Sequence, residues 1–129
     1  MERKLFEEKL EPLCLKEGLA VIPYFSLAMG FLSGKYRSEA DLAKSPRGGG
    51  VKKYLNDRGM KVLAALDQTA ARLDSTPARV AMAWLMARPS ITAPIASATS
   101  TAQLEDLVAS ANLMLDAAGI QSLNDASAW

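Results

Sequence analysis

The fold is decided by the stretch Gly18-Leu19-Ala20-Val21-Ile22-Pro23-Tyr24. Polar residues do not alternate with apolar ones in this run, which predicts a short strand that is covered on both faces. A second run, Ile91-Thr92-Ala93-Pro94-Ile95-Ala96, has the same character. Because helical segments separate the two runs, we expect an α/β fold with two parallel strands and flanking helices.

Helical periodicity surrounds both predicted strands. From about residue 2 to residue 17 one helical face carries the apolar residues Phe6, Leu10, Leu13 and Cys14. Apolar spacing also predicts helices over 62–73, 76–88, 100–110 and 116–126. Thr76 and Pro77 have the form of a helix start, and Ser100 with Gln103 has the form of a capping box.

A pair of strands is too small to form a stable core alone. A parallel pair needs helices on its faces and further strands at its edges. We therefore expect the chain to be part of a larger sheet or barrel. Its unpaired edges and apolar faces would favour self-association or pairing with a complementary fragment.

Residues 36–57 show no clear periodicity and include the run Ser45-Pro46-Arg47-Gly48-Gly49-Gly50. A segment of this length is either a functional loop or disordered. A glycine-rich run can also cradle a phosphate, but this one follows no predicted strand and opens no predicted helix. We predict a mobile loop that acts as a lid.

The composition excludes several classes of function. The chain has 15 Lys and Arg against 14 Asp and Glu, which gives no electrostatic reason to expect nucleic acid or a membrane as partner. The absence of histidine and the single Cys14 exclude an imidazole base, an internal disulfide and a cysteine-cluster zinc site. The charged start, Met1-Glu2-Arg3-Lys4, lacks the apolar core of a secretory signal, so we expect a cytoplasmic protein of one domain.

Three segments carry a specific pattern. Residues 18–36 read GLAVIPYFSLAMGFLSGKY, residues 76–85 read TPARVAMAWL, and residues 92–106 read TAPIASATSTAQLED. In order and spacing they resemble the seventh strand and its loop, the penultimate barrel helix, and the eighth strand with the final barrel helix of aldo-keto reductases.

This resemblance implies the C-terminal portion of a (β/α)8 TIM barrel whose remaining part is absent. Such a barrel takes about 250 residues. It also implies reduction of carbonyls to alcohols with NADPH, although the family's catalytic residues belong to the earlier strands and have no counterpart in this chain. A small-molecule carbonyl substrate would then be reduced only after complementation. The alternative is a catalytically inactive remnant that acts as an oligomeric structural or nucleotide-binding module.

The first group of expected cofactor-binding residues follows the first run. By resemblance, the ring of Tyr24 stacks on the nicotinamide, and the alternative is a strand-end tyrosine that packs in a core. The following loop would wrap the pyrophosphate of NADPH, with small residues that let backbone N–H groups approach. Its matching residues are Ser26, Leu27, Ala28, Gly30 and Leu32. Lys35 and Arg37 are further candidates for phosphate or substrate contacts, or a solvated charge pair.

The second group follows the second run. Ser97, Ala98 and Thr99 lead into a helix N-terminus, where free N–H groups favour an anion. By resemblance this corner binds the 2′-phosphate of NADPH, and Gln103 and Asp106 reach toward the adenosine. Two departures from the family pattern are Ser97, where relatives often have Gly or Lys, and Leu107, where an adenine-contacting Asn is usual. The alternative for this corner is an ordinary capped helix.

Overall fold

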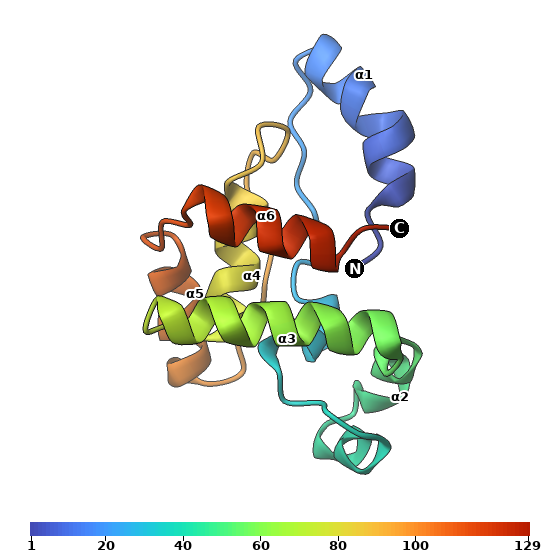
Figure 1. Cartoon of the computed structure of the whole chain (residues 1–129), viewed down its shortest axis with the longest axis vertical. Helices are drawn as coiled ribbons and strands as arrows, with labels where there is room; N and C mark the ends of the chain where they lie inside the picture. Colours follow the sequence, from blue (N-terminus) through green and yellow to red (C-terminus); the bar gives the residue numbers. More distant parts are fainter.

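The computed structural model describes all residues, 1–129, and shows a helical molecule (Figure 1). Its elements are the π-helix η1 (Phe6–Leu10), α1 (Glu11–Lys16), the 3-10 helices η2 (Ala28–Ser33) and η3 (Glu39–Lys44), α2 (Gly48–Val51), the 3-10 helix η4 (Lys52–Tyr54), α3 (Asp57–Arg72), α4 (Pro77–Met86), α5 (Thr101–Ser110) and α6 (Ala117–Ala126).

The expected α/β fold is wrong, because neither apolar run forms a strand. The two runs lie side by side and are joined by one isolated parallel bridge, Val21 to Ile91. The Thr92 N–H donates to the Val21 carbonyl at 2.9 Å, and the Ile95 N–H donates to the Pro23 carbonyl at 3.0 Å. Proline supplies no donor, and no third segment pairs with either run, so the ladder stops there. The structure holds neither a sheet nor part of a (β/α)8 barrel.

The helices expected from periodicity are present, and their first residues are capped as the sequence indicates. The side chains of Thr76 and Ser100 accept hydrogen bonds from the N–H groups of Arg79 and Gln103. Asn56 and Asp116 cap α3 and α6 in the same way. Each of these bonds satisfies one of the free N–H groups at a helix start.

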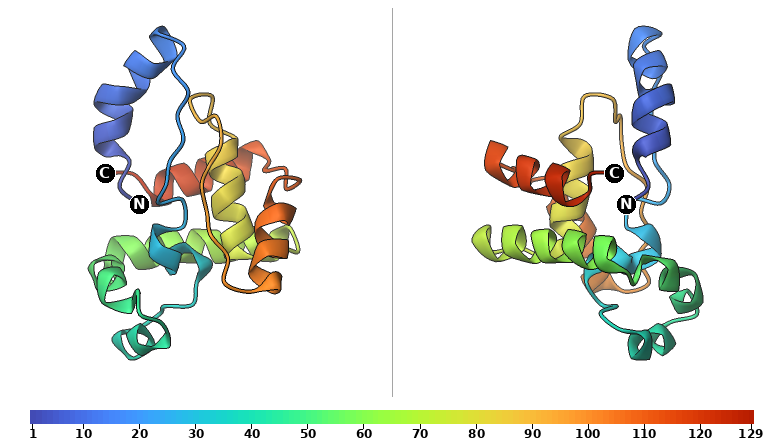
Figure 2. Two further views of the ribbon diagram at one scale, coloured as in Figure 1. Left: turned by 180° about the vertical axis from the view of Figure 1, so that it is seen from behind. Right: turned by 45° about the vertical axis from the view of Figure 1, so that its right-hand side comes forward.

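The core lies where α3 crosses α4, α6 and η2. Its fully buried side chains are Phe31, Tyr36, Val51, Leu63 and Val80. Figure 2 shows the same helices gathered in one half of the molecule, with α1 standing apart. The two extended runs lie beside this helical cluster and do not form a sheet.

Segment 36–57, for which we expect a mobile loop, contains η3, α2 and η4. Three of its side chains, Tyr36, Val51 and Tyr54, belong to the core. An ion pair between Arg37 and Asp67, at 2.7 Å, joins the segment to α3.

The expected apolar face of the first helix is only partly buried. Leu10 and Leu13 remain about half exposed, at 51% and 49%. The segment is held instead by polar contacts, since Arg88 pairs with Glu7 at 2.9 Å and with Glu11 at 3.2 Å. None of the helices is both long enough and apolar enough to span a membrane.

Gly59 provides a test of the core. A Cβ at this position of α3 would lie 1.8 Å from the Tyr54 carbonyl oxygen and 3.0 Å from the Phe31 ring. Gly59→Ala should therefore lower the free energy of unfolding by about 1–3 kcal/mol or more, because the core cannot widen locally. The matched control is Gly49→Ala, since a Cβ there meets nothing within 4 Å. Urea unfolding measures both, and equal stability of the two variants would contradict this packing.

The cap of α6 predicts a pH dependence. Hydrogen bonds from Arg72, and then from the backbone of Gly119, lower the pKa of Asp116 to about 2. A carboxyl with a lowered pKa in the folded state stabilises the fold above its unfolded pKa of about 3.9 and loses this effect as the pH falls toward 2. The urea concentration at the midpoint of unfolding should therefore fall between pH 4 and pH 2, and it should fall less in the Asp116→Asn variant than in the unaltered chain. An unchanged drop would show that Asp116 does not contribute.

Candidate functional site

The two groups of residues expected to bind a cofactor meet at one cavity. Its volume is about 770 Å³, and it lies between the loop that enters η2, residues 45–47 and the start of α5. Of the expected residues it is lined by Tyr24, Ser26, Leu27, Gly30, Ser97, Thr99, Gln103 and Asp106. A cavity of this size is in the range of small-molecule and cofactor sites.

Three of the expected residues lie elsewhere. Ala28 and Leu32 are buried, with 3% and 9% of their surface exposed, and belong to the core. Ala98 does not line the cavity. Ala28 and Leu32 thus hold the loop in place, whereas the polar and small residues between and beside them face the cavity.

The loop at η2 reverses through three successive left-handed residues. Ala28, Met29 and Gly30 have φ values of 48°, 58° and 91°, which is costly for the two that are not glycine. The Gly30 N–H donates to the Leu27 carbonyl at 2.9 Å, and the Ser33 hydroxyl donates to the Gly30 carbonyl at 2.7 Å. These bonds and the buried neighbours keep the reversal in place.

Gly30 also leaves room for a cation. A Cβ there would lie 3.2 Å from Cε and 3.4 Å from Nζ of Lys35, so the lysine chain folds directly over the glycine. Its ammonium group lies 5.0 Å from the centre of the Tyr36 ring. Position 30 thus favours glycine for two reasons, its positive φ and the close approach of the Lys35 side chain.

Lys35 and Arg47 give the cavity its charge. Both line it, and neither forms an ion pair with a carboxylate of the chain. The sequence pattern indicated Lys35 as a candidate, whereas it placed Arg47 only in the expected lid. The one feature of the sequence that could have indicated Arg47 is its position before a glycine run. Residues 36–47 fold back and bring Arg47 to the cavity, and no local sequence pattern predicts this. Arg37, the other basic candidate, is instead paired with Asp67.

The start of α5 supplies polar groups to the opposite wall. Ser100 caps the helix, and the Gln103 side-chain oxygen accepts hydrogen bonds from the N–H and the hydroxyl of Thr99, at 2.9 and 3.1 Å. The loop before the helix is thereby fixed. Ser100 accepts from the Gln103 N–H, whereas the N–H groups of Thr101 and Ala102 in the first turn have no partner within the chain.

Asp106 has a structural role that sequence analysis missed. Its carboxylate accepts hydrogen bonds from Arg79 Nε at 2.6 Å and from the Thr76 hydroxyl at 2.8 Å. Both partners belong to the start of α4, so Asp106 ties α5 to α4. Its charge is therefore balanced within the wall of the cavity.

Tyr24 and Phe25 stand at the mouth of the cavity. Their ring centres are 4.4 Å apart, and Tyr24 is 72% exposed. The ring of Tyr24 is thus not packed in a core, which was the alternative for this residue. An exposed aromatic face at a cavity mouth can stack on a flat ring.

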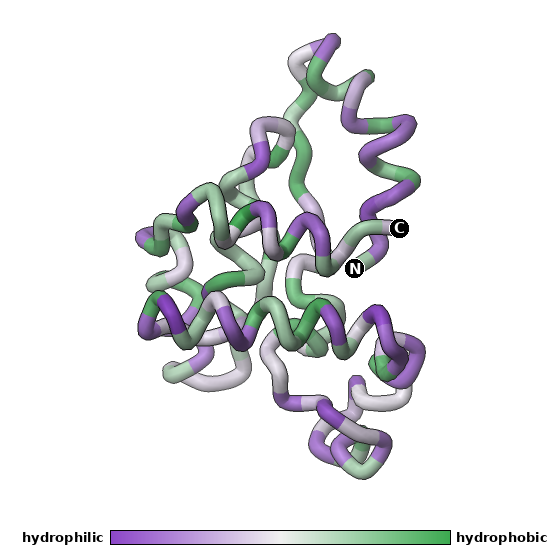
Figure 3. Tube along the Cα trace, in the orientation of Figure 1, coloured by the Kyte–Doolittle hydropathy of each residue, from purple (hydrophilic) through white to green (hydrophobic).

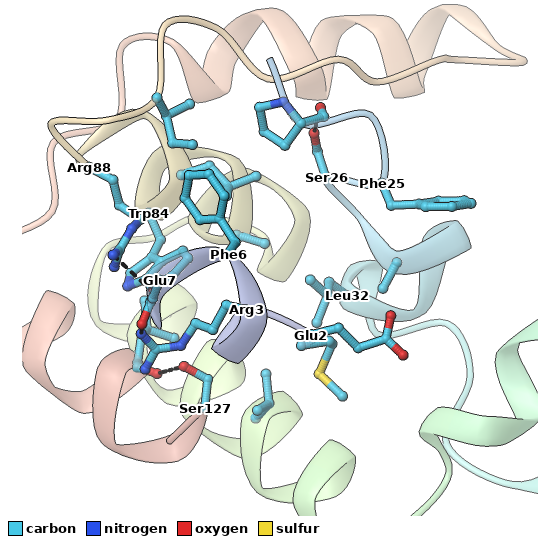
Figure 4. Close-up of a pocket in the computed structure, with 18 of the residues that line it drawn as sticks. Glu2, Arg3, Phe6, Glu7, Phe25, Ser26, Leu32, Trp84, Arg88 and Ser127 are labelled. Carbon is cyan, nitrogen blue, oxygen red and sulfur yellow. Dashed lines mark hydrogen bonds and ion pairs between the residues drawn. The ribbon is translucent and has the colours of Figure 1, made fainter. Parts of the chain in front are cut away.

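A second cavity, of about 380 Å³, lies between the N-terminal segment, the extended runs, α3 and α4, and it shares the lining residues Tyr24, Phe25 and Ser26 with the first (Figure 4). Its walls are mainly apolar, and each of its charged side chains already has an ion-pair partner within the chain. Arg3 pairs with Glu7 at 2.6 Å and contacts the Trp84 ring, and Arg88 pairs with Glu7. Figure 4 shows Arg3, Glu7 and Arg88 gathered beside Trp84. The larger cavity is the candidate site, because its cations Lys35 and Arg47 have no ion-pair partner, whereas the charged side chains of the second cavity are paired.

The larger cavity thus combines two unpaired cations with polar side chains from the segment that leads into α5. The model of the aldo/keto reductase family matches residues 1–128, and the chain belongs to this family. This confirms the resemblance noted in the sequence.

Individual relatives agree with the family assignment. An uncharacterized oxidoreductase of Mycobacterium tuberculosis is 39% identical over 128 residues, which cover 93% of this chain and 37% of that protein. The uncharacterized oxidoreductase YrpG of Bacillus subtilis is 30% identical, over 92% of this chain and 35% of its own length. The aldo-keto reductase yakc [NADP(+)] of Schizosaccharomyces pombe is 22% identical, over 88% and 34%. The chain thus spans little more than a third of the length of these relatives.

The structural role of Asp106 is testable. Asp106→Asn should lower the free energy of unfolding by about 1 kcal/mol, because it weakens the charge-assisted bond to Arg79 at the junction of α4 and α5. The control is Asp125→Asn, a change of the same charge at the end of α6. Thermal or urea unfolding compares them, and an Asp106→Asn variant no less stable than the control would contradict the assignment.

Proposed function

We propose that the chain binds NADPH in the cavity between η2 and α5 and is the cofactor-holding part of a carbonyl-reducing oxidoreductase. One observation carries the proposal. Lys35 and Arg47 line a cavity beside the start of α5, and neither cation has a carboxylate partner. Unpaired cations that share a cavity repel each other, and a bound polyanion removes this cost.

The residues present fit the phosphates of a dinucleotide. Arg47 can form a planar, bidentate contact with phosphate oxygens, and Lys35 provides a point charge over Gly30. On the opposite wall the Ser97 hydroxyl offers a hydrogen-bond donor, and the N–H groups of Thr101 and Ala102 at the start of α5 have no partner within the chain. The 2′-phosphate of NADPH would lie at this corner, which favours NADPH over NADH.

Tyr24 is the residue proposed to orient the nicotinamide. Bound NADPH would supply a hydride for the reduction of a carbonyl. The exposed ring of Tyr24 offers a flat surface at the mouth of the cavity and would fix which face of the nicotinamide is open. The name of the Schizosaccharomyces pombe relative, which includes NADP(+), supports this cofactor.

Reduction of a carbonyl also needs a proton donor. Asp106 is the one carboxylate of the cavity, and Arg79 and Thr76 hold that group. The residues that the family resemblance gives as catalytic have no counterpart in this chain, so the proposed reductase takes its catalytic groups from a complementary fragment. The same observation favours the second candidate, a nucleotide-binding module without catalysis of its own.

The test is a calorimetric titration of the chain with NADPH. Saturable binding in the micromolar range is expected, and NADH should bind more weakly. Lys35→Met and Arg47→Met should each weaken NADPH binding about tenfold or more, since a charge-assisted bond to phosphate contributes about 1.5–3 kcal/mol. The control is Lys61→Met, which removes an exposed cation of α3 that forms no ion pair and lies outside the cavity.

Two results would contradict the proposal. One is the absence of binding up to millimolar NADPH in a chain whose circular dichroism shows the expected helices. The other is an equal loss of affinity in Lys61→Met and in the two cavity variants, which would indicate attraction by overall charge alone. A chain that binds NADPH but reduces no carbonyl, alone or with a complementary fragment, would favour the nucleotide-binding module.

A further inference from the structure

Tyr36 and Ser45 form a hydrogen bond that the proposed function does not use. Tyr36 is fully buried, and its hydroxyl oxygen lies 2.5 Å from the Ser45 Oγ. The Ser45 side chain lines the larger cavity together with Lys35 and Arg47. The bond therefore connects the core of the protein to the wall of the candidate site.

The surroundings of the two hydroxyls decide which of them donates. The Tyr36 hydroxyl forms its one hydrogen bond with Ser45, so its proton would have no acceptor if Ser45 were the donor. A buried donor without a partner is costly and rare in folded proteins. Ser45 is only partly buried and borders the cavity, so its own proton can reach a ligand. Tyr36 is thus the donor and Ser45 the acceptor.

Ser45 accepts a second hydrogen bond, which leaves its proton as its one free group. The Arg47 N–H donates to the Ser45 Oγ at 3.3 Å. A serine hydroxyl has two acceptor lone pairs and one proton. Because Tyr36 and Arg47 occupy both lone pairs, the hydroxyl can only donate to a further group, and no acceptor of the chain takes its proton.

The bond to Tyr36 also fixes where this hydroxyl lies. In Figure 3 the segment below α3 is coloured mainly from hydrophilic to neutral, and none of the residues 37–47 is buried. The position of these residues against the core depends on polar contacts, and the contact that reaches Ser45 comes from the buried Tyr36. The extended backbone of Ser45, with φ −159° and ψ 160°, is an unstrained conformation.

The two unpaired cations of the cavity lie near this hydroxyl. Lys35 Nζ is 5.0 Å from the centre of the Tyr36 ring, whose hydroxyl bonds to Ser45. The Lys44 ammonium donates to the Lys35 carbonyl at 3.3 Å, which ties the two ends of the segment together beside Arg47. A neutral donor near two cations suits a group with several anionic oxygens and adds no further repulsion between charges.

We propose that the Ser45 hydroxyl donates to a phosphate oxygen of the bound nucleotide, between Lys35 and Arg47, and that Tyr36 positions this hydroxyl. The inference rests on the proposed function and assigns this end of the cavity to the diphosphate bridge of NADPH. The 2′-phosphate is proposed to lie at the other end, beside the start of α5. Ser45 is thus a binding residue, and Tyr36 acts through it.

The first test is a calorimetric titration of serine variants with NADPH. Ser45→Ala should bind NADPH about tenfold or more weakly, because a hydrogen bond to a charged group is lost. Ser45→Thr should retain most of the affinity, since it keeps the hydroxyl and a β-branched residue suits the extended backbone. Tyr36→Phe should lose less affinity than Ser45→Ala, because the Ser45 hydroxyl remains but is no longer held in one direction.

The matched control is Ser38→Ala. It removes a serine hydroxyl from the same segment, where Ser38 caps η3 outside the cavity, and should leave the affinity for NADPH unchanged. If loosening of the segment were the cause of weaker binding, this control would lose affinity as well. Circular dichroism and urea unfolding verify that every variant is folded at the temperature of the titration.

The second test locates the contact by ³¹P nuclear magnetic resonance, which resolves the diphosphate of NADPH from its 2′-phosphate. At saturation, Ser45→Ala should change the resonances of the bound diphosphate relative to those in the unaltered chain. The resonance of the 2′-phosphate should stay the same. A change confined to the 2′-phosphate would overturn the assignment of this end of the cavity.

The role of Ser45 and the proposed function fail in different ways. If the chain binds NADPH and Ser45→Ala binds it equally well, or Ser38→Ala loses as much affinity, the role of Ser45 is overturned and the nucleotide site remains. If the chain does not bind NADPH, the proposed function fails, and a titration with inorganic pyrophosphate decides on Ser45 alone. Weaker binding of pyrophosphate to Ser45→Ala would then support its role, and equal binding or none would overturn it.

Discussion

The burial of Phe31 is the interaction on which the rest of the structure depends. Its side chain is fully buried, with its ring centre 5.5 Å from that of Tyr54. Gly59 admits the ring because any larger residue at the start of α3 would collide with it and with the Tyr54 carbonyl. Phe31 belongs to η2, so this contact joins the loop of the candidate site to the longest helix.

This anchoring explains how a loop with unfavourable backbone angles keeps one shape. Ala28 and Met29 have positive φ values, a conformation that costs about 1–3 kcal/mol at a residue other than glycine. The burial of Phe31 and Leu32 immediately after them offsets that cost. The strained residues thus lie beside the cavity, next to Gly30 and Lys35. The buried contacts of Phe31 and Leu32 hold them in place.

Local signals in the sequence predicted the helices well. Thr76, Ser100 and Asp116 each mark a helix start that the structure confirms, since a cap depends only on residues within one turn. The expected strands were wrong for a reason of a different kind. A strand requires partners on its edges, and a run such as 19–24 carries the composition of a strand whether or not those partners are present.

The candidate site shows the same division between local and distant information. Family resemblance led to both walls of the cavity, because Ser26, Gly30, Ser97 and Thr99 lie next to recognisable helix and loop signals. It did not reveal that Asp106 is held by Arg79, or that Arg47 reaches the cavity. Those facts depend on how α4 meets α5 and how residues 36–47 fold back, which are contacts between segments far apart in the chain.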